Sequence, residues 1–88
     1  MKRFAITVTG QVQGVSYRKG AREQAIRLGL AGFARNEPDG TVYVEVEGPE
    51  PQLQEFLAWC QTGSPSAIVE SVTYQEHLPG GHVGFDRL

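Results

Sequence analysis

The hydrophobic residues of this chain follow two spacings in turn, and the order of these spacings restricts the fold more than any other feature. Residues 3–9 alternate hydrophobic with polar or small side chains, which is typical of a strand with one buried face. Residues 19–28 repeat their hydrophobic side chains at helical spacing. In chain order, the sequence predicts strand, helix, two strands, helix and strand, over residues 3–9, 19–28, 30–36, 42–47, 51–62 and 68–76.

This order predicts an α+β fold of the ferredoxin-like β-α-β-β-α-β type, with an antiparallel sheet and two helices on one face. Crossovers of this kind are nearly always right-handed, so both helices should lie on the same side and leave the other sheet face open to water. Turn residues at 37–40 predict a hairpin between the second and third strands. Val83 and Phe85 predict a short closing strand at a sheet edge, and a chain of 88 residues predicts one domain, residues 1–88.

The same spacings predict which side chains form the core. Tyr43, Glu45 and Glu47 alternate with inward residues and are expected on the solvated face of the sheet. Cys60 belongs to the buried stripe of the second helix and is read as a core residue, not as a nucleophile. The expected core is Phe4, Ile6, Val8, Tyr17, Ala21, Ala25, Leu28, Val42, Val44, Val46, Leu53, Phe56, Leu57, Cys60, Val72 and Tyr74.

Composition narrows the classes of function. Eight basic and ten acidic residues give a net charge of −2, which argues against a general nucleic-acid binder. No hydrophobic run is long enough to cross a bilayer and no signal peptide begins the chain, so we expect no membrane partner and a cytoplasmic location. A single cysteine excludes an internal disulfide, and Cys60, His77 and His82 are too few for a zinc site, so no metal is expected.

One junction between strand and helix suggests chemistry. The run from Gly10 to Arg18 precedes the first helix, whose first N–H groups lack intrahelical partners and carry partial positive charge. Such a junction binds anions readily, and Arg18 adds a planar fork of donors that can hold a phosphate or a carboxylate. A purely structural turn fits these residues equally well, because Gly14 would then only permit a positive φ. Neither a Walker loop nor a dinucleotide-binding fingerprint is present.

Positive charge is concentrated near this junction. All basic residues except Arg87 fall within the first 35 positions. This asymmetry suits a small anionic substrate bound at the first loop, although solvated helix faces explain most of it.

The run G-x-V-Q-G-V-x-Tyr-Arg, which ends at Arg18, closely resembles the signature of the acylphosphatase family. The segments 32–36, 39–42 and 63–67 resemble further conserved blocks of that family, so the likeness covers nearly the whole chain. It departs from the family pattern at Tyr17, where Phe is usual, and at Phe33-Ala34, where Trp-Val is commoner. Neither change removes a group that the family uses in catalysis.

The resemblance implies a site and a reaction. It implies that Arg18 holds the phosphate together with loop residues, and that Asn36 orients the attacking water. From the residues alone, Asn36 would rather be a local cap before a turn. The loop residues expected to bind phosphate are Gly14, Val15, Ser16, Tyr17 and Arg18.

The implied activity is hydrolysis of an acyl phosphate to a carboxylate and inorganic phosphate, without metal or cofactor. Inorganic phosphate would be product and inhibitor, and the protein a monomer. A non-catalytic module that senses anions on the same fold is the alternative from another class of function. A third possibility is the acylphosphatase-like part of the hydrogenase-maturation carbamoyltransferase, although the other domains of that enzyme are not expected in 88 residues.

Overall fold

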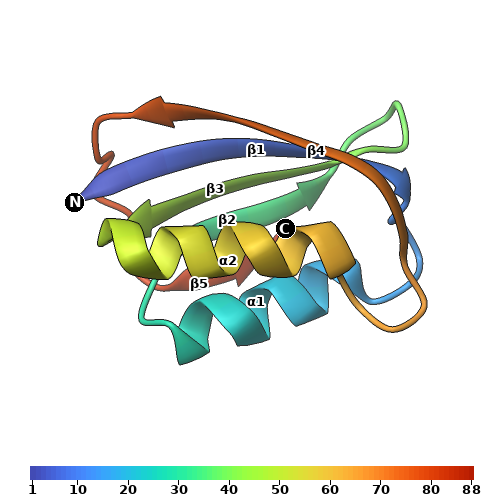
Figure 1. The fold of residues 1–88 in the computed structure, drawn as a ribbon, viewed down its shortest axis with the longest axis horizontal. Coiled ribbons are helices and arrows are strands. Elements are labelled where there is room, and N and C mark those ends of the chain that lie inside the picture. Colours follow the sequence, from blue (N-terminus) through green and yellow to red (C-terminus); the bar gives the residue numbers. More distant parts are fainter.

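The structure is a computed structural model and describes residues 1–88. Its elements in chain order are β1 (Lys2–Gln11), α1 (Tyr17–Arg27), β2 (Ala31–Asn36), β3 (Val42–Gly48), α2 (Glu50–Thr62), β4 (Ile68–His77) and β5 (Phe85–Arg87). The predicted β-α-β-β-α-β order is confirmed, with β5 added after it. Both helices lie on the same face of the sheet, as predicted (Figure 1). Neither helix has the length and hydrophobicity that a membrane span requires.

The five strands form one sheet in the order β4-β1-β3-β2-β5. The first four pair antiparallel, as predicted, whereas β5 pairs parallel to β2, which makes the whole sheet mixed. Phe85 begins this closing strand and is buried, but the predicted part of Val83 in it is wrong. Val83 is 93% exposed, because the chain turns at Gly84, whose φ is +69°, before the strand begins.

The core fills the space between the sheet and the two helices. One face of β1 and one face of β3 are fully buried there, and α2 contributes Leu53, Phe56, Leu57 and Cys60. Burial of a large apolar side chain stabilises a fold by about 1.5–3 kcal/mol, so this layer supplies most of the driving force for folding. The predicted alternation in β1 and β3 is confirmed.

Each helix ends where the sequence predicts a stop. Gly29 follows α1 with a φ of +71°, and the Leu30 N–H donates to the carbonyl oxygen of Ala25 at 2.8 Å, which closes a Schellman motif. The chain then enters β2 directly. At the start of α2, Pro49 and Pro51 flank Glu50. The first N–H groups of a helix have no partner within it, so the N–H groups that these prolines lack cost no helical hydrogen bond.

Two expectations about the sheet faces need correction. Tyr74 lies opposite Ile6 and its ring packs on Phe4 with centroids 4.7 Å apart, but it is 42% exposed because β4 is an edge strand. Val72 is only partly buried for the same reason. These residues face the core without being enclosed by it.

The second correction concerns Glu47, which is buried, not solvated. The connection between β4 and β5 crosses this part of the open sheet face, and its Gly80, Gly81 and His82 N–H groups donate to the Glu47 carboxylate. The carboxylate therefore replaces the water that these three donors would otherwise bind. Glu45 is covered partly by the same connection, through a bond with the His82 ring.

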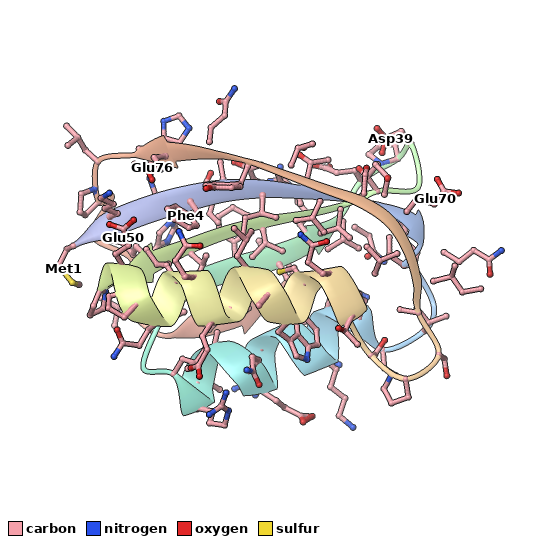
Figure 2. The ribbon with its side chains drawn as sticks, viewed as in Figure 1. Met1, Phe4, Asp39, Glu50, Glu70 and Glu76 are labelled. Carbon is pink, nitrogen blue, oxygen red and sulfur yellow. The ribbon has the colours of Figure 1, made fainter.

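The two ends of the molecule differ in what they hold. Glu50 and Glu76 lie near Met1, and both carboxylates pair with Lys2, at 2.7 Å and 3.4 Å (Figure 2). Asp39 marks the hairpin between β2 and β3 at the opposite end (Figure 2). That end also contains the loop from β1 to α1 (Figure 1).

Candidate active site

A hollow of about 490 Å³ opens between the β1–α1 loop and the end of β2. It is lined by Val12, Gly14, Ser16, Tyr17, Arg18, Lys19, Asn36 and Arg87. Three of these residues are cations and none is acidic, so the hollow favours an anion electrostatically. Arg18 and Asn36, which lie on different segments, are brought to one place.

The loop that forms one wall turns sharply at two left-handed residues. Gly14 has a φ of +73° and Ser16 a φ of +62°, and Ser16 is the only residue other than glycine with a positive φ. A non-glycine residue in this region costs roughly 1 kcal/mol or more, so the surrounding structure must hold Ser16 there. A Cβ at Gly14 would meet nothing within 4 Å, so Gly14 is required for its φ rather than for close packing.

Helix α1 begins at Tyr17, two residues earlier than predicted, and points its N-terminus at the hollow. The Gly20 N–H donates to the Ser16 carbonyl oxygen at 3.0 Å, which closes the first turn. The N–H groups before Gly20 have no partner within the helix, and they add partial positive charge to the wall. An anion in the hollow would satisfy these donors.

Arg18 and Asn36 occupy complementary positions. Arg18 is partly buried and lines the hollow, and its Nη1 donates to the carbonyl oxygen of Leu88. Asn36 is the last residue of β2 and pairs with Val42 of β3. The Asn36 Oδ1 is buried and has no hydrogen-bond partner in the protein. Buried amide oxygens nearly always accept a bond, so the protein alone leaves the Asn36 amide unsatisfied at the edge of the hollow.

Two hydrogen bonds, one buried and one partly buried, attach the loop to the last turn of α2 and to the turn that follows it. Ser64 Oγ donates to the Val15 carbonyl oxygen at 2.6 Å, and the Tyr17 hydroxyl donates to the Cys60 carbonyl oxygen at 2.8 Å. Burial raises the pKa of Tyr17, so this hydroxyl stays protonated and remains a donor. Because the Tyr17 side chain is enclosed, it can offer an anion only its backbone N–H.

Val15 does not line the hollow, unlike the other predicted loop residues. Its side chain packs against the core, and its carbonyl oxygen is turned to Ser64. Cys60 is enclosed in the core, and burial raises the pKa of its thiol to about 12, so it is a thiol and not a thiolate at neutral pH. This environment confirms its interpretation as a core residue.

Sequence reasoning missed three residues that line the hollow, Val12, Lys19 and Arg87, and two whose hydrogen bonds hold its surroundings, Gln13 and Ser64. Gln13 and Ser64 stand inside the quoted motifs, so those motifs could have drawn attention to them. Arg87 carried no such signal. It reaches the hollow because β5 pairs parallel to β2, with Arg87 opposite Ala34.

Comparison with known proteins identifies the class to which this arrangement belongs. A sequence profile of the family described as acylphosphatase matches residues 4–86. An acylphosphatase from Gloeobacter violaceus is 43% identical over 86 residues, which cover 98% of this chain and 92% of the relative.

Solved structures agree with the sequence comparison. The crystal structure of acylphosphatase from Bacillus subtilis superimposes with a TM-score of 0.98 at 36% identity, covering 100% of this chain and 99% of that one. Full-length HypF, solved in a phosphate- and nucleotide-bound form, matches with a TM-score of 0.91 at 26% identity. This match covers 99% of this chain but only 12% of the HypF chain.

Proposed function

We propose how the site works from the premise that this chain belongs to the acylphosphatase family and is an acylphosphatase. The substrate class is small acyl phosphates. In the proposed reaction, the phosphate of the substrate binds in the hollow with its oxygens toward the loop N–H groups and Arg18. The lining without acidic residues supports this placement, because a carboxylate there would repel the phosphate.

Asn36 positions the nucleophile in this proposal. Its side-chain amide, part of the lining of the hollow, holds a water molecule and aims the water oxygen at phosphorus. The observation that carries the proposal is that Asn36, whose Oδ1 has no partner in the protein, lines the same hollow as Arg18.

The bond changes need no strong base. The water oxygen forms a bond to phosphorus while the bond from phosphorus to the bridging acyl oxygen breaks, and the carboxylate leaves with that electron pair. The water proton passes to a phosphate oxygen. Because a carboxylate is a good leaving group and the transition state is loose, catalysis requires mainly positioning and stabilisation of charge. Arg18 and the loop N–H groups supply the stabilisation of charge.

The remaining expectations form part of the same proposal. We place the activity in one domain, residues 1–88, acting as a cytoplasmic monomer, with inorganic phosphate as competitive inhibitor and no metal or cofactor in the reaction. The three basic side chains in the lining, with no acidic one beside them, support inhibition by phosphate. Sedimentation of the purified protein tests the monomer.

Hydrolysis of benzoyl phosphate, followed by loss of its ultraviolet absorbance with excess chelator present, tests the reaction. We expect saturable turnover that inorganic phosphate inhibits competitively. If phosphate binds without turnover above the uncatalysed rate, the anion-sensing alternative replaces this proposal. Turnover that disappears with chelator and returns with a divalent cation would overturn the metal-free step.

A further inference from the structure

Gln13 joins the β1–α1 loop to the hairpin that follows Asn36, the two segments beside the hollow. Its Nε2 donates two hydrogen bonds, to the carbonyl oxygen of Glu37 at 2.8 Å and to that of Thr41 at 2.9 Å. Gln13 directly precedes Gly14 in the loop, and Glu37 directly follows Asn36. The two bonds therefore join the residue beside the phosphate-binding loop to the residue beside Asn36.

No strand pairing performs this function. In the sheet, β3 lies between β1 and β2, so Asn36 and the loop are not on neighbouring strands. The ladder from β1 ends at Val8 opposite Val42, and the ladder from β2 ends at Asn36 opposite the same Val42. Beyond Val42 the loop and the hairpin leave the sheet separately, and the Gln13 amide bridges them.

The two acceptors and the burial of Gln13 make its bridge specific for the base of the hairpin between β2 and β3. The Glu37 N–H donates to the Thr41 carbonyl oxygen at 2.9 Å, so both acceptors of Gln13 lie at the base of one closed hairpin. A primary amide has two N–H donors, and both are used. Gln13 is itself partly buried, which protects these bonds from competition with water.

We propose that Gln13 is a positioning residue that sets the distance between the bound phosphate and the water held by Asn36. The inference rests on the role proposed above for Asn36. Gln13 makes no contact with substrate in this assignment, so its loss displaces the nucleophile without removing an anion-binding group. A misplacement of about 1 Å in a reacting group can lower a rate by about 10²-fold.

Gln13→Met tests the inference, because methionine keeps the length and packing of the side chain and removes both donors. Gln11→Met is the matched control, since Gln11 is exposed at the end of β1 and its side chain makes no hydrogen bond. We expect kcat for benzoyl phosphate to fall by about 10- to 100-fold in Gln13→Met. The phosphate Kd by calorimetry should stay within about 2-fold of wild type, and Gln11→Met should leave both unchanged.

A double variant separates positioning from general damage. If Gln13 acts through Asn36, adding Gln13→Met to Asn36→Ala should lower kcat by no more than about 2-fold further. Full additivity of the two effects, or equal losses of kcat and phosphate affinity in Gln13→Met, would overturn the inference. Circular dichroism confirms that each variant is folded.

Two further results keep the inference separable. If Gln13→Met does not fold, Gln13→Asn takes its place. Asparagine keeps a polar amide, but its side chain is one methylene shorter, so the amide no longer reaches both carbonyl oxygens. A normal kcat in Asn36→Ala would refute the proposed role of Asn36. A normal kcat in a folded Gln13 variant, with Asn36→Ala impaired, would refute the inference about Gln13 alone.

Discussion

The Tyr17 hydroxyl donates a hydrogen bond to the carbonyl oxygen of Cys60 at 2.8 Å, across 43 residues of sequence. The bond joins the first residue of α1 to the last turn of α2 inside the core. Gly63 lies against the same ring, since a Cβ on Gly63 would come within 2.6 Å of it. The Tyr17 ring therefore fixes where α1 begins relative to α2.

Tyr17→Phe should reduce stability and spare catalysis. The change leaves the buried Cys60 carbonyl oxygen without this donor, which costs about 1–3 kcal/mol of unfolding free energy. The ring and the backbone N–H of residue 17 remain, so kcat should be within about 2-fold of wild type. Urea titration and benzoyl phosphate hydrolysis measure the two effects, and unchanged stability would contradict the assigned bond.

Arg18→Gln should lower kcat/KM by about 10²-fold or more, because it removes a charged donor from a preorganised anion site. The Arg18 bond to Leu88 is exposed, so the unfolding free energy should change little. Arg27→Gln is the matched control, since Arg27 lies on the same helix outside the hollow. Near-normal turnover in folded Arg18→Gln would remove Arg18 from the mechanism.

Ser64→Ala should weaken phosphate binding by about 5-fold, because the Val15 carbonyl loses its buried donor and the loop loses rigidity. Ser66→Ala on the same turn is the control, because Ser66 is exposed. Calorimetry with inorganic phosphate measures the affinity. Equal affinities in the two variants would show that Ser64 does not hold the loop.

Glu45 should make stability depend on pH in acid. Burial alone would raise the pKa of its carboxyl, but hydrogen bonds from Tyr43, His82 and Arg3 lower it overall, below its ordinary 4.5. A carboxyl group with a lowered pKa contributes its full stabilisation when the pH is above its pKa in the unfolded chain. That contribution is lost as the pH falls through its pKa in the folded protein. The difference in unfolding free energy between wild type and Glu45→Gln should thus shrink below about pH 4.5. Urea titrations across this range measure it, and a constant difference would contradict the assignment.

The sequence predicted elements and missed connections, for a physical reason. Alternation in residues 3–9 and helical spacing in residues 19–28 are local properties of the chain, and they determine which face of each element is buried. The parallel pairing of β5, and with it the arrival of Arg87 at the hollow, depends on the folded sheet. Local pattern contains no information about that pairing.

The residues of the candidate site likewise divide into those that local sequence indicates and those that only the folded structure brings together. Gly14 and Arg18 were recognisable because a strand-to-helix junction has known chemistry, whereas Asn36 needed the family resemblance. Ser64 and Gln13 act by side-chain bonds to backbone oxygens 49 and at most 28 residues away. The burial of Glu47 depends likewise on a connection that crosses the open face of the sheet. Such bonds exist only once the elements have packed.

In the proposed mechanism Arg18 binds the phosphate and Asn36 positions the water. One paired measurement on Asn36→Ala tests this assignment most directly. Benzoyl phosphate turnover and the phosphate Kd are measured on the same purified variant and on wild type, with chelator present. We predict a fall in kcat of about 10²-fold or more with the Kd unchanged within about 2-fold, because Asn36 holds water and not phosphate. Normal turnover, or a loss of phosphate affinity as large as the loss of kcat, would contradict it.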